Sequence, residues 1–553
     1  MKFKDFLQFH KVILDGGMGT LLQEKGLKAG QFPELWNLTH PEEITAIHKA
    51  YYESGANVIC TNTFGANALK FDADTLRSVI CAAVSNAKTA RETANSTKEK
   101  FIALDIGPTG KLLKPYGDLD FEDAVSIFAE TVKIGVSCGV DLILIETMND
   151  AYETKAAVLA AKETCDLPII VTNAYGSDGK LMTGATPGAM VAMLEGLGVD
   201  AIGANCSLGP KQLMGVAEEL LACASVPVAL KPNAGLPHLE GEKTVFDVDP
   251  DEFADIMAIL ACKGLRLLGG CCGTTPAHIA ALSAKVAGLD PIPVTDKGLT
   301  VVSSYTHAVE FGEKPLLIGE RINPTGKKRL KAAILEGDFD YILSEGVAQQ
   351  EKKVQILDVN VGLPGIDEAG ILTKAVTSLQ EIIDLPLQID TADVDAMEAA
   401  LRRYNGKALI NSLSGKEESM AAIFPLVKKY GGVVVALTLD ENGIPATAEG
   451  RFEIAEKILK TAEKYGISRK NIVFDTLCMP ISADSSAGKV TLQAMARIRR
   501  ELGCHTILGV SNVSFGLPNR DAVNGVFFTM AMENGLSAAI MNPNSSEMWK
   551  AYY

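Results

Sequence analysis

The stretch Asp141-Leu-Ile-Leu-Ile-Glu-Thr-Met148 joins an uninterrupted run of large apolar residues to a polar end. Such a run is typical of a parallel strand that is covered on both faces. A stretch with the composition of a helix follows it, and a second apolar run begins at Pro168. The order strand, helix, strand predicts a parallel βαβ unit.

This unit recurs along the whole chain. The apolar runs of the first half are 12–17, 57–64, 101–107, 141–148, 168–176, 201–209, 227–235 and 265–273. Those of the second half are 316–323, 354–362, 386–393, 407–415, 432–440, 471–479, 505–514 and 537–543. Eight strands in series over about 250 residues predict a (β/α)8 barrel. We therefore expect an α/β protein of two consecutive (β/α)8 TIM barrels. Doubly wound open sheets are the alternative, but no strand ends in a GxGxxG turn that opens a helix.

A break between the two series sets the expected domains. Two prolines, Pro291 and Pro293, stop any helix there, and residues 299–311 alternate in character like a hairpin or a plug under the second unit. We expect a first barrel over residues 1–290, a linker over 291–314 and a second barrel over 315–553.

Composition excludes several classes of partner. The 553 residues carry 52 Lys and Arg against 68 Asp and Glu, a formal charge of −16, so nucleic acid and anionic membranes are unlikely partners. No apolar run approaches the roughly 18 residues of a membrane helix, and no secretion signal follows Met1. The 11 cysteines are an odd number, which favours reduced thiols in the cytoplasm. Most are expected to be small core residues: Cys60, Cys81, Cys138, Cys165, Cys223, Cys262, Cys478 and Cys504.

The remaining three cysteines lie at two strand ends. Cys206 ends the sixth strand, and Cys271 and Cys272 end the eighth, so all three can meet at the mouth of the first barrel. Adjacent residues of a regular strand point to opposite faces, so we expect Gly269, Gly270 and Gly273 to permit a bend through positive φ angles. Three thiolates suit Zn²⁺ with a fourth position left for substrate. The alternative is that Cys206 is core packing and the Cys-Cys pair a coincidence.

Such a site would bind an incoming thiol and hold it deprotonated, which indicates alkyl transfer to sulfur. Other strand ends could hold the rest of an amino-acid thiol, or they could be loop caps. The loop from Asp15 to Thr20, which includes Gly19, offers main-chain N–H groups to a carboxylate, and Asp15 and Glu146 could take an ammonium group. Further polar contacts could come from Asn62, Thr63, Asn205 and Asn233.

Six motifs of the first half together resemble the homocysteine S-methyltransferase family. They are DGGMGT (15–20), TNTF (61–64), IET (145–147), GANCSLGP (203–210), KPNAG (231–235) and GGCCGTTP (269–276). The resemblance implies that Cys206, Cys271 and Cys272 bind zinc and that homocysteine completes the coordination as a thiolate.

The second half carries Asp and Asn at its strand ends. A carboxylate can accept two parallel hydrogen bonds from an amino-pyrimidinone edge, and an amide serves a ligand that mixes donors with acceptors. This inventory fits a flat polar heterocycle such as a pterin, and equally a purine; buried aspartates that order loops are the plain alternative.

The motifs GERINPTG (319–326), DVN (358–360), QIDTAD (388–393), INSLSGKE (410–417) and GVSNVSFG (509–516) resemble the pterin-binding methyltransferase family. The resemblance implies tetrahydrofolate contacts from Asn323, Pro324, Thr325, Asp358, Asn360, Asp390, Asn411 and Asp475. It places Asn512 near the methyl-bearing nitrogen and matches Arg520 to the folate-site arginine that follows the SNVSF motif. Methyl transfer from a tertiary amine needs that nitrogen to become partly cationic, so Asn512 is the candidate catalytic residue, stabilising the protonated form or relaying a proton through water.

Both barrels in this order resemble the substrate-binding half of cobalamin-dependent methionine synthases. This implies that a methyl group passes from 5-methyltetrahydrofolate through cobalamin to homocysteine, giving methionine and tetrahydrofolate. None of the 7 histidines lies in a DxHxxG motif, so we expect a corrinoid-binding domain or protein outside this chain. The alternatives are a fusion with a flavin-dependent methylenetetrahydrofolate reductase, an enzyme with another methyl source such as S-methylmethionine, and a zinc- and folate-binding scaffold without activity.

Overall fold

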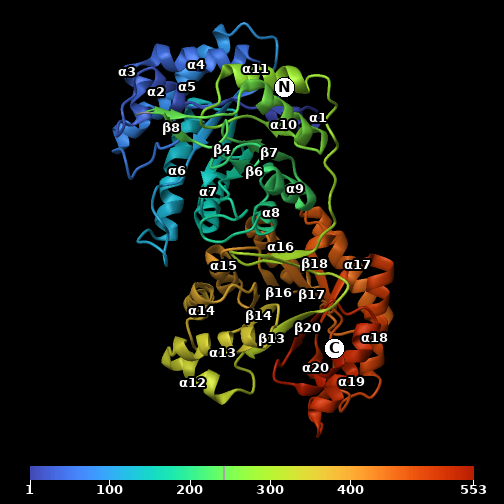
Figure 1. Cartoon of the computed structure of the whole chain (residues 1–553). Coiled ribbons are helices and arrows are strands. Elements are labelled where there is room, and N and C mark those ends of the chain that lie inside the picture. The colour runs from blue at the N-terminus through green and yellow to red at the C-terminus, as the bar shows by residue number, and fades with distance from the viewer. Residues whose placement is uncertain (241–242) are drawn as a thin grey trace. The chain divides into compact units, whose positions relative to one another are not determined.

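The computed structural model describes residues 1–240 and 243–553 and contains two compact units (Figure 1). The first unit comprises Met1–Glu195 and Val199–Lys297. The second comprises Gly196–Gly198 and Gly298–Tyr553. Each unit has its own sheet of eight parallel strands and its own layer of helices.

The sheet of the first unit runs in the order β1-β10-β7-β6-β5-β4-β3-β2, and a parallel contact between Leu14 and Val58 joins its two ends. Its strands are β1 (Val12–Ile13), β2 (Val58–Cys60), β3 (Phe101–Ile106), β4 (Leu142–Met148), β5 (Ile169–Asn173), β6 (Ala201–Asn205), β7 (Val228–Lys231) and β10 (Leu267–Leu268). The order confirms a barrel. β1 and β10 are shorter than predicted, because the residues after them bend into the mouth.

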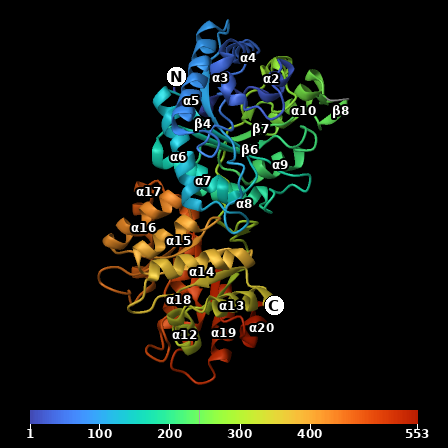
Figure 2. The ribbon, with the colours of Figure 1, turned by 90° about the vertical axis from the view of Figure 1, so that its left-hand side faces the viewer.

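Helices alternate with these strands and cover the outside of the barrel (Figure 2). The longer ones are α4 (Pro41–Glu53), α5 (Ala73–Thr93), α6 (Phe121–Cys138), α7 (Ala151–Thr164), α8 (Pro187–Leu197), α9 (Met214–Cys223), α10 (Pro250–Cys262) and α11 (Pro276–Val286). An aspartate before α5, α6, α7 and α10 accepts a hydrogen bond from a main-chain N–H of the first turn, which fixes where each helix begins.

The helix α1 (Phe3–Phe9) fills the lower end of this barrel, where the strands begin. The Phe3 ring lies 5.2 Å from that of Phe101, the first residue of β3. Arg266, directly before β10, donates to the main-chain oxygen of Gln8 at 3.1 Å. The mouth formed by the carboxyl ends of the strands is therefore opposite a filled end.

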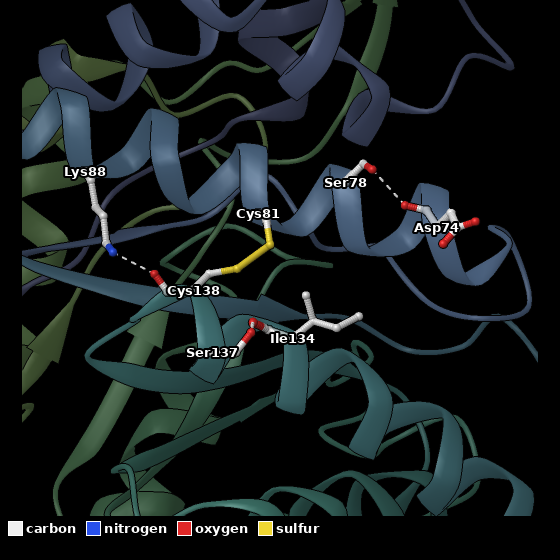
Figure 3. Close-up of a disulfide and its surroundings, with 7 residues drawn as sticks. All are labelled: Asp74, Ser78, Cys81, Lys88, Ile134, Ser137 and Cys138. Atoms are coloured by element: carbon white, nitrogen blue, oxygen red, sulfur yellow. Dashed lines mark hydrogen bonds between the residues drawn. A yellow bond between two sulfur atoms is a disulfide. The ribbon is translucent and has the colours of Figure 1, made fainter.

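A disulfide joins two neighbouring helices of the first unit (Figure 3). It links Cys81 of α5 to Cys138 of α6, whose Cα atoms are 5.7 Å apart. Lys88 of α5 donates to the main-chain oxygen of Cys138 at 2.6 Å and adds a second contact between the helices. The expectation that Cys81 and Cys138 are separate reduced core residues is wrong. The two residues are 57 positions apart, and only the packing of α5 against α6 brings them together.

The second unit is a closed barrel whose eight parallel strands follow one another in chain order. They are β13 (Leu316–Ile322), β14 (Ile356–Val359), β15 (Leu387–Asp390), β16 (Leu409–Ser414), β17 (Val433–Leu437), β18 (Ile472–Asp475), β19 (His505–Gly509) and β20 (Ala538–Met541). The longer helices between them are α12 (Lys328–Glu336), α13 (Phe339–Glu351), α14 (Glu368–Ile382), α15 (Val394–Arg403), α16 (Glu417–Tyr430), α17 (Ala448–Lys464), α18 (Ala487–Arg497) and α19 (Arg520–Glu533), and α20 (Ser546–Tyr552) follows the last strand. The prediction of a second barrel is confirmed.

A hairpin of β11 (Val301–Ser303) and β12 (Ala308–Glu310) fills the lower end of the second barrel. Ser303 pairs with Lys407, shortly before β16, and its main-chain oxygen accepts a hydrogen bond from Tyr404 at 2.7 Å. Val302 packs into the barrel core with Ile318 and Val433. The hairpin thus fills the lower end of the second barrel, as α1 fills that of the first.

Within the part of the chain that the structure describes, every helix is too short or too polar to cross a membrane.

Candidate functional site

The three predicted cysteines converge at the mouth of the first barrel. One Sγ atom from each of Cys206, Cys271 and Cys272 lies within 4.8 Å of the others, and the Cys206 and Cys272 sulfurs are 3.9 Å apart. Two sulfurs on a tetrahedral zinc, each about 2.3 Å from the metal, would be about 3.8 Å apart. The spacing of the donors therefore fits zinc, and the three ligands leave a fourth position for another group.

Unusual backbone angles direct these cysteines into the mouth. Cys206 and Ser207 have φ values of 60° and 57°, in the left-handed region that costs free energy for residues other than glycine. Gly273 has a φ of 77°, as predicted, but Gly269 and Gly270 do not adopt positive φ angles. Neighbouring atoms leave no room for a side chain at these positions. A Cβ on Gly269, for example, would lie 2.7 Å from the Cβ of Leu14. The expected role of these two residues is therefore corrected.

Two asparagines support the cysteines from below. Asn233 accepts a hydrogen bond from the main-chain N–H of Cys272 at 3.1 Å. Asn205 directs its Nδ2 towards the sulfur of Cys271 at 4.0 Å, while its Oδ1 accepts from the N–H of Thr147 at 2.7 Å. Both residues were predicted to contact substrate. Their side chains orient the cysteines and the end of β4, and their contact with substrate stays a prediction.

The three sulfurs lie close enough to affect one another's ionisation. Hydrogen bonds with Cys271 and Cys272 lower the pKa of Cys206, and hydrogen bonds with Cys206 and Cys272 raise the pKa of Cys271. Thiols lose their protons when they bind a divalent ion, so a metal at this position would hold the three cysteines as thiolates.

A charged network fills the barrel next to the cysteines. Lys231, at the end of β7, is buried, and its Nζ lies 2.7 Å from Glu146 Oε2 and 3.6 Å from Asp15 Oδ1. The thiol of Cys60 donates to Asp15 Oδ1 at 3.1 Å, and its main-chain N–H donates to Asp15 Oδ2 at 2.7 Å. Asp15 and Glu146 thus lie where they were predicted, but they already share a lysine.

The sequence reasoning missed Lys231, Cys60 and Asp105 of this network. A sequence pattern could have identified them, because each is a polar residue or thiol at or near the end of an apolar strand. Cys60 was read as a core residue, and Lys231 was noted only as part of a motif.

The other predicted thiol-site residues lie at the edge of the mouth. Asn62 donates to the main-chain oxygen of Pro33 at 2.8 Å and so holds the segment before α3 (Trp36–Thr39). Thr63 donates to the main-chain oxygen of Asp105 at 2.7 Å. Gly19 begins the short helix α2 (Gly19–Glu24).

The second mouth collects carboxylates and amides from the ends of its strands. Asn360, after β14, donates to Asp390 Oδ2 at 3.1 Å, and Asp390 pairs in register with Asn411 of β16. The side chain of Asn323 hydrogen-bonds to Asp358. Pro324 and Thr325 form the turn after β13, in which the N–H of Thr325 donates to Asn323 Oδ1 at 3.1 Å.

Burial raises the pKa values of these carboxyls. It raises the pKa of Asp475, at the end of β18, to about 6, although the N–H of Leu477 donates to its Oδ1 at 2.7 Å. Burial also raises the pKa of Asp390 to about 6, against the hydrogen bond from Asn360. The pKa of Asp358 is raised well above its usual range by burial and by the charge of Asp390. These groups can accept hydrogen bonds from a ligand that replaces the missing solvation.

Asn512 lies in a short 3₁₀ helix, Val510–Ser514, directly after β19, and is exposed. Arg520 donates to Ser514 Oγ at 3.0 Å and to the main-chain oxygen of Ser511 at 2.8 Å. Arg520 therefore fixes the loop that carries Asn512.

The sequence motifs did not identify Gln388 as an individual site residue. Its side chain donates to Asp358 Oδ1 at 2.7 Å, and its buried Oε1 has no hydrogen-bond partner among the described residues.

Comparisons with known proteins match each half of the chain to a family model. Residues 12–286 match the family model described as homocysteine S-methyltransferase, and residues 319–542 match the one described as pterin binding enzyme. The chain is 32% identical to methionine synthase of Mycobacterium leprae over 565 residues, which are 96% of this chain and 47% of that protein. It is 32% identical to methionine synthase of Mycobacterium tuberculosis over 571 residues, 97% of this chain and 48% of that protein. The chain thus spans about half the length of the curated relatives it matches.

Among solved structures, the metallated form of a homocysteine methyltransferase from Escherichia coli is 25% identical. The match covers 50% of this chain and 96% of that one, with a TM-score of 0.42.

Proposed function

Since this chain joins a homocysteine S-methyltransferase domain to a pterin-binding domain and is a relative of methionine synthases, we propose that it carries the two substrate sites of such an enzyme. The first barrel, residues 1–290, would bind homocysteine, and the second, residues 315–553, would bind 5-methyltetrahydrofolate. The methyl group would travel between them on a corrinoid-binding domain or protein, and the products would be methionine and tetrahydrofolate.

The convergence of Cys206, Cys271 and Cys272 is the observation that carries this proposal. Zinc held by these three sulfurs would supply the positive charge that keeps the thiol of homocysteine deprotonated at neutral pH. Asn205 and Asn233 would keep Cys271 and Cys272 in place while the fourth position changes its occupant. The three thiols must stay reduced to hold the metal, which favours the cytoplasm as the place of action, whereas the Cys81–Cys138 disulfide between α5 and α6 points the other way.

The amino-acid part of the substrate would lie towards β1 and β4. Glu146 and Asp15 make this region negative, and Lys231 balances part of that charge. The segment held by Asn62 would limit access of water from the edge of the mouth.

In the second barrel, Asp390 and Asp475 would accept hydrogen bonds from the pterin ring, and Asn411 would offer both a donor and an acceptor. Asn512, on the loop that Arg520 fixes, would face the methyl-bearing nitrogen and hydrogen-bond to it as it becomes cationic. Asn323, Pro324, Thr325, Asp358 and Asn360 would complete the rim of this site.

Two half-reactions test the proposal. The zinc-loaded chain should transfer methyl from methylcobalamin to homocysteine, and separately from 5-methyltetrahydrofolate to reduced cobalamin, both supplied in solution. Failure of both reactions with zinc bound would leave only a binding scaffold. A yellow chromophore that copurifies with the chain would favour the reductase alternative.

A further inference from the structure

Arg451, in the first turn of α17, is a buried cation that holds the loop after β18. The residue is only 3% exposed. Its Nη1 donates to the main-chain oxygens of Thr476 at 2.6 Å and Leu477 at 2.9 Å, and to Thr491 Oγ1 at 3.1 Å. Its Nε donates to the main-chain oxygen of Pro445 at 3.1 Å. A buried charge needs such partners, and these ones join the loop after β18 to α17 and α18.

The peptide between Thr476 and Leu477 has a hydrogen bond at each end. Its oxygen accepts from Arg451, and its N–H donates to Asp475 Oδ1 at 2.7 Å. This peptide is trans, so its oxygen and its N–H point in opposite directions within one plane. A donor that fixes the oxygen therefore also aims the N–H.

The backbone at this point needs to be held. Leu477 has a φ of 60°, in the left-handed region that costs free energy for a residue other than glycine. Its main-chain oxygen accepts from Arg451 and from Thr491 Oγ1, the latter at 3.0 Å. These contacts keep the N–H of Leu477 directed at Asp475.

The charge of Arg451 acts on Asp475 in the same direction as this hydrogen bond. Burial raises the pKa of Asp475 to about 6, whereas the N–H of Leu477 and the charge of Arg451 both lower it. Hydrogen bonds in a chain also polarise one another, so a cation at the oxygen of a peptide strengthens its N–H as a donor.

Three other neighbours of Asp475 carry no charge near neutral pH. Leu437 of β17 and Ile507 of β19, which pair with Asp475 in register, have no ionisable group. Burial raises the pKa of the Cys478 thiol, in the loop after β18, to about 12. Arg451 is therefore the neighbour whose charge acts on this carboxyl.

We infer that Arg451 is a positioning residue of the second mouth: through the Thr476–Leu477 peptide, it fixes the Asp475 carboxylate in the orientation that accepts hydrogen bonds from the pterin ring. This inference rests on the proposed function, in which Asp475 is one of the acceptors. Arg451 does not need to reach the ligand, because the peptide passes its effect to the carboxylate.

A double-mutant cycle on the affinity for 5-methyltetrahydrofolate tests this inference. Calorimetry at pH 7 gives the Kd of the wild type, of Arg451→Met, of Asp475→Asn and of the chain with both substitutions. We expect Arg451→Met alone to weaken binding about tenfold, the value of one hydrogen bond to a charged group. In the Asp475→Asn background it should weaken binding by less than about twofold, because the group through which it acts has been replaced.

The pH dependence of the affinity gives a second readout, which a merely structural residue would not change. Arg451→Met removes a charge that favours the ionised form of Asp475. The affinity should therefore begin to fall at a higher pH in this variant than in the wild type. The shift should be absent when Asp475→Asn is also present.

Arg499→Met is the matched control. Arg499 also donates to a main-chain oxygen, that of Cys504 at 3.2 Å, but directly before β19 and so at the opposite end of the barrel. Its affinity and pH dependence should equal those of the wild type. Thermal unfolding verifies that each variant is folded. If Arg451→Met is not, Arg451→Lys, which keeps the charge without the planar fork of donors, enters the same cycle, and its smaller loss should also vanish with Asp475→Asn.

Equal losses in the two backgrounds, or no loss in the Arg451 variants, would overturn the inference. So would an Asp475→Asn variant that binds 5-methyltetrahydrofolate as tightly as the wild type. A wild-type chain that does not bind 5-methyltetrahydrofolate would instead reject the proposed function, so the two failures are distinguishable.

Discussion

The mouths of the two barrels differ in how their cations contact the nearby carboxylates. In the first, the cation Lys231 contacts the carboxylates Asp15 and Glu146 directly. In the second, two cations near the site donate to main-chain oxygens: Lys327 to those of Glu320 and Asn323, and Arg451 to that of Thr476. The carboxylates of the first mouth therefore share a direct ion pair with a lysine, whereas Asp390 and Asp475 of the second have pKa values raised to about 6 by burial. A cation in direct contact thus occupies a carboxylate, whereas a buried carboxylate without such a contact stays open to a ligand.

The largest effect should come from breaking the metal site. We expect Cys272→Ser to lose zinc and to slow methylation of homocysteine by more than about 100-fold, since even residues that only support a metal ligand matter by about 10- to 100-fold. Elemental analysis and the methylcobalamin assay measure the two losses.

The same variant should leave the transfer of methyl from methyltetrahydrofolate to reduced cobalamin intact. A parallel loss of that activity would show that the two mouths do not work independently.

Removing an acceptor from the second mouth should have the reciprocal effect. We expect Asp475→Asn to weaken binding of 5-methyltetrahydrofolate by roughly 10- to 100-fold, the value of one hydrogen bond to a charged group. Calorimetry measures the dissociation constant, and zinc content should not change. Asp338→Asn, which alters the aspartate before α13, is the control and should bind normally. Unchanged affinity in Asp475→Asn would remove Asp475 from the site.

The two mouths should also respond differently to pH. Asp390 and Asp475 have pKa values raised to about 6, so both gain protons, and lose acceptor strength, as the pH falls through 6. We expect affinity for 5-methyltetrahydrofolate to fall several-fold between pH 7 and pH 5, where ordinary aspartates would still be ionised. Titration of the dissociation constant over this range checks it. An affinity that is flat down to pH 5 would mean that the ligand does not need the ionised carboxyls.

The last prediction concerns the stability of the first barrel. His48, on α4, is fully buried, neither ring nitrogen has a hydrogen-bond partner among the described residues, and burial lowers its pKa to about 3. The unfolded chain gains the proton near pH 6.5 and the folded chain does not, so stability should fall by about 2 kcal/mol between pH 7 and pH 5.

His48→Leu should abolish this part of the pH dependence and raise the melting temperature at pH 5 by a few degrees. Calorimetry at pH 7 and pH 5 is the measurement, with His10→Gln, at an exposed position, as control. An identical pH dependence in His48→Leu and wild type would contradict the assignment.

The sequence sufficed for what depends on local patterns. Buried parallel strands read as apolar runs, so both barrels were predictable, and the carboxyl ends of strands located Cys206, Cys271 and Cys272 together. The sequence could not show which hydrogen-bond partner each polar side chain has. Asn205 and Asn233 have the chemistry of ligand-binding residues, and only the structure shows that their amides also contact the cysteines.

Other features depend on contacts between distant segments. Lys231 reaches Glu146 across 85 positions, and Cys81 meets Cys138 only because α5 packs on α6. The buried Oδ1 atom of Asp105 has no hydrogen-bond partner among the described residues, and no sequence pattern predicts an unsatisfied atom.

The filled lower ends of the barrels limit the routes by which ligands can reach the two sites. With α1 packed at the base of one and the β11–β12 hairpin at the base of the other, each barrel is filled at the end where its strands begin. In the proposed cycle, the amino-acid substrate, its methylated product and the methyl carrier would therefore all approach the first site from the carboxyl ends of the strands. Exchange of methionine for fresh homocysteine would then follow withdrawal of the carrier, and the closed base of the barrel would impose that order.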